Sequence, residues 1–321
     1  MNGPQDSPLI IGLPSKGRLK EQVEAWLSDC GIDLAVSGGA RGYLASLKGL
    51  PGAQVRLLSA ADIAEALDRG EVHLGITGED LLRETGADLE GRVLLLRALG
   101  FGRADLVVAA PRSWLDVETM GDLEEVAHDY LARTGRRMRV ATKYLAQTRA
   151  FFAGHGVVDY RIVESGGATE GAPAAGAAEL VIDITTTGAT LQANGLKVLD
   201  DGVILKSQAQ LAASLGATWT PAQLGSAEHL VRVVEARAAA LTSATLIWPA
   251  SGDAVEARVV DGLVQAGATR RPHGLLVSAG EVARTSAALT MAGLGPVTAA
   301  RPDFVFEVGC PAIEALGNRV L

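Results

Sequence analysis

Short apolar runs that fit β-strands alternate along most of this chain with runs that have the spacing of amphipathic helices. The pattern is clear at the start, where residues 9–13 form an apolar run. Residues 19–30 follow it, with Leu19 and Val23 on one helical face. Alternation of this kind predicts an α/β fold in which helices cover largely parallel sheets. A content of 48% hydrophobic and 21% charged residues fits a globular protein of that class.

The same pattern extends over the rest of the chain. We expect further strands at residues 54–58, 72–76, 94–96, 105–110, 139–141, 160–163, 180–184, 245–248, 274–278 and 304–308. We expect further helices at residues 62–69, 123–134, 145–155, 228–241, 255–266 and 282–292. We therefore predict a separate small α/β domain from about residue 241, with the order strand, helix, strand, helix, strand.

The charge balance and the cysteine content restrict the partners and the compartment. A net charge of −8 argues against a nucleic-acid-binding protein, and no apolar run of the sequence approaches the ~18 residues of a membrane helix. Cys30 and Cys310 are too few for a disulfide framework or a thiolate metal site. The five histidines lack metal-binding spacing, so we expect no metal ligand among the side chains. These features predict a cytoplasmic protein that binds neither a membrane nor nucleic acid.

The most informative stretch runs from residue 179 to residue 195, with the sequence ELVIDITTTGATLQANG. An apolar strand ends near Asp183, a threonine-glycine turn follows, and a short helical pattern begins. Such a turn directs backbone N–H groups, hydroxyls and the positive end of a helix to one spot, which suits a phosphate. The hydroxyl donors are Thr185, Thr186, Thr187 and Thr190, and Gly188 lets the backbone approach a ligand closely. A plain capped helix after a strand would explain the same residues.

Six motifs in a fixed order resemble one known family. They are LPSKGRL at 13–19, LGITGED at 74–80, GFGR at 100–103, ATKY at 141–144, GGATEGAP at 166–173 and DITTTGATLQANG at 183–195. Together they are similar to the ATP phosphoribosyltransferase family, which catalyses the first step of histidine biosynthesis. The resemblance covers roughly residues 8–215 and does not extend motif by motif into the C-terminal part.

The resemblance implies two α/β lobes joined by crossing strands, like a type II periplasmic binding protein. It implies that residues 1–105 and 186–220 form lobe I and that residues 106–185 form lobe II. Residues 241–321 would be a C-terminal regulatory or oligomerisation domain. The implied reaction joins N1 of ATP to C1 of phosphoribosyl diphosphate and gives phosphoribosyl-ATP and pyrophosphate. No general base is required, since N1 of adenine is unprotonated near neutral pH, and the implied cofactor is Mg²⁺ held mainly by pyrophosphate and water.

The resemblance also assigns candidate binding residues. The ribose 5-phosphate would lie on the 187–190 turn, and Glu170 and Asp183 would hold the ribose hydroxyls. The full set expected to bind phosphoribosyl diphosphate is Glu170, Asp183, Thr185, Thr186, Thr187, Gly188, Ala189 and Thr190. The set expected to bind ATP or pyrophosphate is Lys16, Arg18, Arg56, Asp80 and Arg103. Each of these five side chains also has a plain structural explanation. Lys16 and Arg18 could belong to a solvated turn, Asp80 could cap a helix, and Arg56 and Arg103 could form surface ion pairs.

The family also implies partners. ATP and phosphoribosyl diphosphate would be the substrates, L-histidine a feedback inhibitor, and the chain a homo-oligomer. Some family members rely on a separate regulatory subunit, and the sequence leaves that arrangement open. An alternative function is a non-catalytic two-lobed protein that binds a small anion or effector. A third interpretation keeps the enzyme but makes the C-terminal domain an oligomerisation module only.

Overall fold

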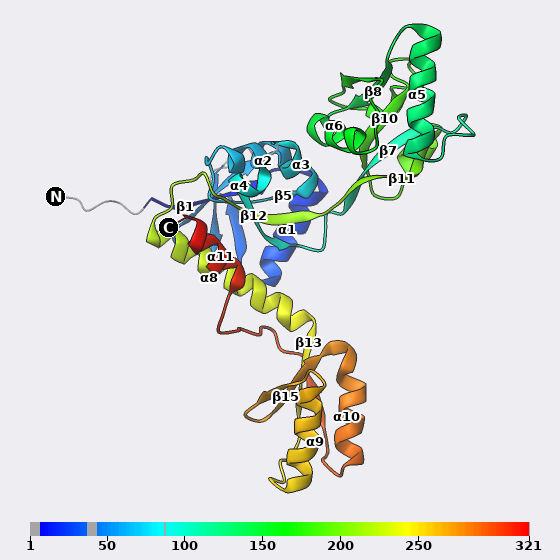
Figure 1. The fold of residues 1–321 in the computed structure, drawn as a ribbon. Coiled ribbons are helices and arrows are strands. Elements are labelled where there is room, and N and C mark those ends of the chain that lie inside the picture. The colour runs from blue at the N-terminus through cyan, green and yellow to red at the C-terminus, as the bar shows by residue number, and fades with distance from the viewer. Residues whose placement is uncertain (1–6, 37–43, 87, 321) are drawn as a thin grey trace, which may run out of the picture.

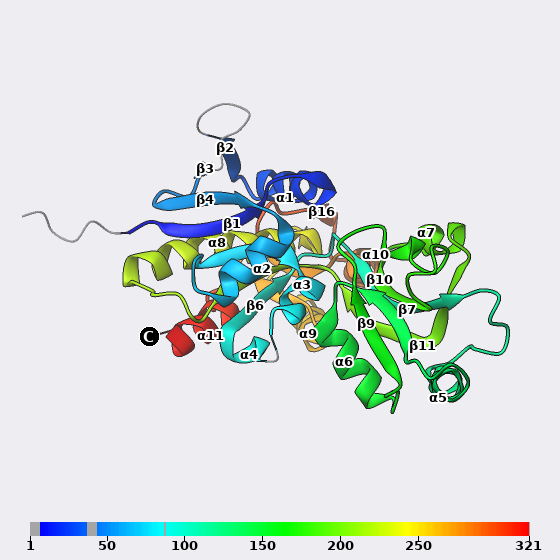
Figure 2. The same cartoon turned by 90° about the horizontal axis from the view of Figure 1, so that it is seen from above.

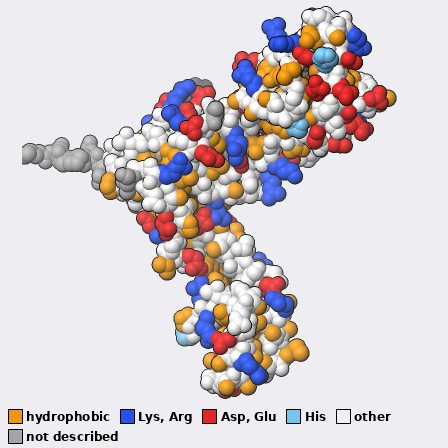
Figure 3. Space-filling model, in the orientation of Figure 1, with side chains coloured by type: hydrophobic (Ala, Val, Ile, Leu, Met, Phe, Trp, Pro, Cys, Tyr) orange, Lys and Arg blue, Asp and Glu red, His pale blue; other side chains and the backbone are white. Residues whose placement is uncertain are grey.

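The computed structural model describes residues 7–36, 44–86 and 88–320, so the outermost ends of the predicted domain ranges lie outside the described residues. The chain forms three units, each built on one sheet, which we call lobe I, lobe II and the C-terminal unit (Figure 1). Seen from above, lobe I and lobe II lie side by side (Figure 2). Basic and acidic side chains are interspersed over all three units on the face shown in Figure 3.

Lobe I contains a seven-stranded sheet in the order β2-β3-β4-β1-β5-β12-β6. The strands are β1 (Leu9–Pro14), β2 (Asp33–Val36), β3 (Leu44–Lys48), β4 (Ala53–Leu58), β5 (Leu74–Gly78), β6 (Val93–Ala98) and β12 (Ala209–Ser214). Its helices are α1 (Gly17–Asp29), α2 (Ala60–Asp68), α3 (Glu79–Glu84), α4 (Leu89–Arg92), α8 (Pro221–Leu241) and α11 (Pro311–Val320). Helix α1 buries Val23 and Leu27, as its spacing predicts. Burial raises the pKa of the neighbouring Cys30 thiol to about 11, which suits a core residue.

Lobe II contains a five-stranded sheet in the order β11-β7-β10-β8-β9. The strands are β7 (Ala104–Pro111), β8 (Met138–Thr142), β9 (Tyr160–Glu164), β10 (Leu180–Thr185) and β11 (Leu196–Ser207). Its helices are α5 (Met120–Thr134), α6 (Leu145–Gly154) and the short α7 (Ala189–Ala193). A separate core holds the lobe together, with Tyr144, Phe152 and Ile182 fully buried.

Both sheets are mixed, whereas the strand-helix alternation predicted largely parallel sheets. Strands β4, β1 and β5 run parallel in lobe I, as do β9, β8 and β10 in lobe II. The strands that cross between the lobes run antiparallel to their neighbours. We expected residues 186–220 in lobe I, but β11 pairs with β7 in lobe II and only β12 joins the first sheet. The reason is that the backbone hydrogen bonds of β11 up to Ser207 are made to lobe II.

The C-terminal unit has an antiparallel sheet in the order β14-β15-β13-β16. Its elements are β13 (Ser243–Ile247), α9 (Ala254–Gln265), β14 (Thr269–Arg271), β15 (Gly274–Ser278), α10 (Val282–Met291) and β16 (Thr298–Ala300). The order is thus strand, helix, strand, strand, helix, strand. The predicted order was wrong because β14 spans only three residues, too few for a periodic pattern.

The end of the chain leaves the C-terminal unit and returns to lobe I (Figure 1). Residues 304–308 are not a strand, although their apolar pattern predicted one. They run along α8, where the Val305 N–H donates to the Ala236 carbonyl at 2.9 Å. Helix α11 then packs on α8 and β6 and buries Leu316 completely in the core of lobe I. In the part of the chain that the structure describes, no helix is both long and apolar enough to cross a membrane.

Candidate active site

The candidate site lies in the cleft where both lobes present the carboxyl ends of parallel strands. Ligands of open α/β sheets bind at such ends. In lobe I, β1 leads into the turn before α1, and β5 leads directly into α3. In lobe II, β10 leads into the threonine-glycine turn. A cavity of about 470 Å³ joins these ends, and its lining includes Arg18 and Asp80 from lobe I, Thr186 from lobe II and Arg103 from the crossing segment.

Two cations line this cavity. Arg18 lies in the first turn of α1, and Arg103 directly precedes β7. Both side chains are exposed, and neither has an ion-pair partner among the described residues. The turn of lobe II contacts the same place, since the Thr186 hydroxyl donates to the Arg103 carbonyl at 3.4 Å. Unpaired guanidinium groups in a cavity favour an anionic ligand, because arginine holds phosphate oxygens with two parallel hydrogen bonds.

The threonine-glycine turn is partly satisfied by its own hydroxyls. The Gly188 N–H donates to Thr185 Oγ1 at 2.9 Å, and the Ala189 N–H donates to Thr187 Oγ1 at 3.4 Å. Each hydroxyl keeps its own hydrogen as a donor. Among the described residues, the Thr187 and Thr190 N–H groups have no acceptor. Helix α7 has only five residues, so these hydroxyl and amide donors, more than a helix dipole, are what the turn can offer to an anion.

Gly188 adopts a left-handed backbone with φ of 74°, which L side chains rarely tolerate. This conformation turns the chain from the end of β10 into α7. An added Cβ would have no neighbour closer than Gln192 Nε2 at 4.0 Å. The glycine therefore suits its backbone conformation and leaves the turn open, and it is not needed for packing within the protein.

Asp183 and Glu170 lie close enough to influence one another. Burial raises the pKa of the Asp183 carboxyl above its ordinary value, and the nearby Glu170 carboxylate adds to the increase. Two groups lower the pKa of Asp183 and so oppose this increase. They are the Ile184 N–H, which donates to Asp183 Oδ1 at 2.8 Å, and the positive charge of Lys143, which follows β8. The two carboxyl groups expected to hold ribose hydroxyls thus belong to one electrostatic cluster.

Asp80 is buried, with 6% of its surface exposed, and both of its carboxylate oxygens are occupied. Ser207 Oγ donates to Oδ1 and Tyr144 Oη donates to Oδ2, each at 2.7 Å. Asp80 therefore does more than cap α3, because it joins lobe I to lobe II and to the end of β11. Its oxygens face protein donors, although the residue also lines the cavity.

Several candidates lie outside this cavity lining. Of the residues expected to bind phosphoribosyl diphosphate only Thr186 belongs to it, and the lining does not include Glu170, Asp183, Thr185, Thr187, Gly188, Ala189 and Thr190. Of the second set, Lys16 and Arg56 lie outside it. Lys16 is the exposed N-cap residue of α1, beside Arg18. Arg56 lies on β4, and its guanidinium donates at 3.1 Å to the carbonyl of Glu71, which precedes β5. That carbonyl belongs to the amino-terminal side of the strand, away from the carboxyl ends that form the cleft. Their assignments stay predictions.

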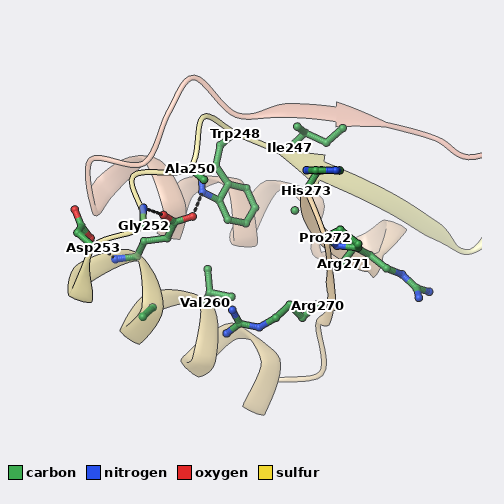
Figure 4. Close-up of a pocket in the computed structure, with 13 residues that line it drawn as sticks. Ile247, Trp248, Ala250, Gly252, Asp253, Val260, Arg270, Arg271, Pro272 and His273 are labelled. Carbon is green, nitrogen blue, oxygen red and sulfur yellow. Dashed lines mark hydrogen bonds between the residues drawn. The ribbon is translucent and has the colours of Figure 1, made fainter.

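A larger cavity of about 620 Å³ lies in the C-terminal unit, between α9 and the β14–β15 turn (Figure 4). Its charged lining consists of Asp253, Glu256, Arg270 and Arg271. Glu256 accepts hydrogen bonds from Trp248 Nε1 at 2.9 Å and from the Gly252 N–H at 2.7 Å. None of the residues that the sequence singled out lines it. Size alone does not make it the reaction site, since it belongs to one unit and receives nothing from the strand ends of the two lobes.

Three residues of the lobe junction escaped the sequence analysis. Tyr144 lies inside the ATKY motif, which was a signal of its importance, but its role depends on a contact with Asp80. Glu84 and Ser207 belong to none of the six motifs. Sequence spacing carries no signal for them, because their partners are 62 to 127 residues away.

Comparisons with known proteins agree with this geometry. The family model described as "HisG: ATP phosphoribosyltransferase" matches residues 59–236. An ATP phosphoribosyltransferase of Caulobacter vibrioides is 65% identical over 301 residues, which cover 94% of each chain. The chain belongs to the ATP phosphoribosyltransferase family. The resemblance predicted from the six motifs is confirmed, together with its transferase activity in the first step of histidine biosynthesis.

Other ATP phosphoribosyltransferases extend the comparison. The enzyme of Rhodopseudomonas palustris strain BisA53 is 58% identical over 233 residues, covering 73% of this chain and 72% of that relative. The solved ATP phosphoribosyl transferase (HisG:HisZ) complex from Thermotoga maritima contains a chain that is 25% identical, with a TM-score of 0.54. The match covers 71% of this chain and 98% of that one. The predicted two-lobed α/β fold is likewise confirmed, with the small antiparallel sheet as an addition.

Proposed function

We propose that the cleft between lobe I and lobe II is where this ATP phosphoribosyltransferase joins N1 of ATP to C1 of phosphoribosyl diphosphate. The observation that supports this most is the cavity itself. Its lining combines Arg18 and Arg103, which have no ion-pair partner among the described residues, with Thr186 of the threonine-glycine turn. Two phosphate-binding features from different lobes suit a reaction that must hold two phosphorylated substrates together.

In this proposal the turn holds the ribose 5-phosphate. The hydroxyls of Thr185, Thr187 and Thr190 and the free amides of the turn donate to it, and Gly188 and Ala189 keep the backbone accessible. The Thr186 hydroxyl joins them when it rotates away from the Arg103 carbonyl. Glu170 and Asp183 accept from the ribose hydroxyls, which orients C1. A transition state with oxocarbenium character places positive charge on the ribose, so these carboxylates also stabilise it.

Arg18 and Arg103 are assigned to the pyrophosphate and the ATP phosphates. They restrain the leaving group while adenine N1 attacks C1 from the opposite side, so rate enhancement comes from positioning and charge. Lys16, Arg56 and Asp80 stay predictions for this second set. Asp80 would act there through the groups that it orients, since its oxygens are engaged by the protein.

Mg²⁺ is proposed as a cofactor that arrives on the diphosphate. Among the described residues, no three His, Cys, Asp or Glu side chains gather as a metal site, and a magnesium ion usually keeps several waters and binds substrate phosphates. The donor set therefore fits an ion held by pyrophosphate and water. When bound, it would neutralise charge on the departing pyrophosphate.

We propose further that L-histidine inhibits the enzyme through the C-terminal unit. Its cavity offers both carboxylates and guanidinium groups, which complement the two charges of a free amino acid. We also propose that the chain works in the cytoplasm as a homo-oligomer, with a separate regulatory subunit as the alternative arrangement. Activity and mass of the purified chain alone distinguish the two: full activity of a homo-oligomer supports the first, and activity that depends on an added subunit supports the second.

The central test is pyrophosphate release by the purified chain. We expect release only when ATP, phosphoribosyl diphosphate and Mg²⁺ are all present, and a thermal shift with phosphoribosyl diphosphate. A thermal shift without any turnover would favour the alternative of a non-catalytic anion-binding protein. A shift with L-histidine that Trp248→Ala abolishes would support the C-terminal cavity as the inhibitor site.

A further inference from the structure

Helix α6 of lobe II receives its N-terminal cap from lobe I. Its N-cap residue, Tyr144, makes no side-chain capping hydrogen bond. Instead, the Glu84 carboxylate at the end of α3 accepts from the Ala146 N–H at 2.8 Å and from the Gln147 N–H at 3.2 Å. A carboxylate at this position satisfies two otherwise unpaired donors and interacts favourably with the helix dipole. The first turn of α6 is thus completed only when the two lobes are in contact.

A second set of contacts lies one turn away on α3. Tyr144 Oη donates to Asp80 Oδ2 at 2.7 Å, and Gln147 Nε2 donates to the Asp80 carbonyl at 2.8 Å. Ser207, where β11 leaves lobe II, binds the other carboxylate oxygen and accepts from the Asp80 N–H at 3.0 Å. Tyr144 has no exposed surface, so water does not compete for its hydroxyl. Lobe I, lobe II and a crossing strand therefore meet at one buried carboxylate.

This junction lies against the wall of the cleft. Asp80 and Leu81 line the cavity that also contains Arg18 and Arg103. Leu81 packs against the cores of both lobes. Figure 2 shows α3 and α6 as neighbours where the lobes meet. Within residues 7–36, 44–86 and 88–320, the backbone passes from one lobe to the other at two segments, between β6 and β7 and between β11 and β12. Two such crossings leave the angle between the lobes adjustable, as in other hinged proteins.

We propose that Glu84 and Tyr144 are positioning residues that clamp α6 onto α3 and so hold the cleft at the width that the two substrates need. This inference rests on the proposed function of the cleft. With the clamp in place, substrates meet lobes that are already aligned. Without it, binding must also align them, so the apparent affinity falls by the fraction of molecules in the aligned state. Once both substrates are bound, the lobes are aligned again and the chemical step is unaffected.

The test is a comparison of steady-state constants for clamp variants of the full chain. Glu84→Ala removes both capping acceptors, and we expect the KM for ATP and for phosphoribosyl diphosphate to rise roughly 3- to 30-fold. We expect kcat to stay within about twofold, since the bound state is the same. Glu84→Gln retains one carbonyl acceptor, so its KM values should lie between those of Glu84→Ala and those of the wild type. Tyr144→Phe removes only the hydroxyl and should change KM in the same direction.

Thr119→Ala is the matched control. Thr119 caps α5 within lobe II, where its hydroxyl accepts from the Asp122 N–H at 3.2 Å and donates to the Asp122 carboxylate at 2.8 Å, so its side-chain hydrogen bonds stay within the cap of that helix. This variant should lose a similar amount of thermal stability and keep both KM values. Small-angle X-ray scattering adds a direct measurement: Glu84→Ala without substrates should be more extended than the wild type, and both substrates together should remove the difference.

Unchanged KM values in a folded Glu84→Ala protein would overturn the inference, as would a loss of kcat at constant KM. If Glu84→Ala does not fold, Tyr144→Phe decides by the same criteria. An inactive wild type would refute the proposed function, and the clamp would then be tested by scattering alone. In that measurement, equal dimensions of Glu84→Ala and the wild type would refute the clamp.

Discussion

Replacing Gly188 by alanine tests the phosphate-binding role of the threonine-glycine turn. The added methyl group meets no protein atom closer than 4.0 Å, so steric conflict within the protein is absent at this described position. The backbone φ of 74° nevertheless places an L-residue in the left-handed region, which costs about 1–2 kcal/mol. The protein should therefore fold, with slightly lower stability.

The effect on substrate binding should be larger than the effect on folding. A shift of the turn that disrupts one charge-assisted hydrogen bond to the phosphate removes about 1.5–3 kcal/mol. That loss corresponds to a roughly 10- to 150-fold increase in the KM for phosphoribosyl diphosphate. The KM for ATP should change little, because its assigned arginines are elsewhere in the cleft. Pyrophosphate release at varied phosphoribosyl diphosphate measures both constants.

Gly195 provides the matched control at the other end of α7. Its φ of 70° is nearly the same, and an added Cβ would have nothing within 4 Å. Gly195→Ala should therefore cause the same loss of melting temperature and no change in KM. Equal KM values for the two variants, with Gly188→Ala folded, would refute the role of the turn in binding the 5-phosphate.

Three further predictions address the cation, a buried histidine and the returning helix. Arg18→Gln should raise the KM for ATP about tenfold or more, measured by pyrophosphate release, and an unchanged KM would remove it from the site. Burial lowers the pKa of His73, whose Nδ1 accepts from the Ile10 N–H, so the folded protein prefers the neutral ring. Its contribution to the free energy of unfolding should be complete above pH ~6.5 and should fall below that by at most about 1.4 kcal/mol per pH unit. Urea titrations at pH 8 and pH 5.5 should show a weaker pH dependence in His73→Gln. Leu316→Ala should lower the free energy of unfolding by about 2–4 kcal/mol, because α11 belongs to the core of lobe I, and a loss below 0.5 kcal/mol would contradict that packing.

The position of α11 changes how the C-terminal unit should be tested. The sequence predicts a separate domain from about residue 241, which a deletion of everything after residue 240 would remove. In the structure that deletion would also remove Cys310, Ile313 and Leu316 from the core of lobe I. Point substitutions in the cavity of the C-terminal unit separate regulation from folding, whereas the deletion would combine them.

Local features of this protein could be read from its residues. The 180–185 strand, the glycine turn and the start of α7 are adjacent in sequence, so their order alone predicts a strand-turn-helix unit. Arg18 follows an apolar strand in the same way. Both features reach the cleft because parallel strands place their carboxyl ends at one edge.

Long-range pairings could not be read in that way. The apolar pattern of β11 would suit either sheet, so the sequence does not say which one it joins. The structure shows that it pairs with β7 in lobe II. The sequence allows Asp80 to be a helix cap or an ATP ligand, and only the structure shows Tyr144 and Ser207 hydrogen-bonded to its two carboxylate oxygens. Partners more than 60 residues apart leave no periodic trace in the sequence.

The sequence by itself therefore determined the α/β class, the family and the threonine-glycine turn between a strand and a helix, since each depends on neighbouring residues and their order. The tertiary structure alone decided which strands share a sheet, where the last helix packs and which buried polar groups meet between the lobes. The physical reason is that propensity and patterning act over a few residues, whereas burial and hydrogen bonding between distant segments are settled only when the whole chain is packed.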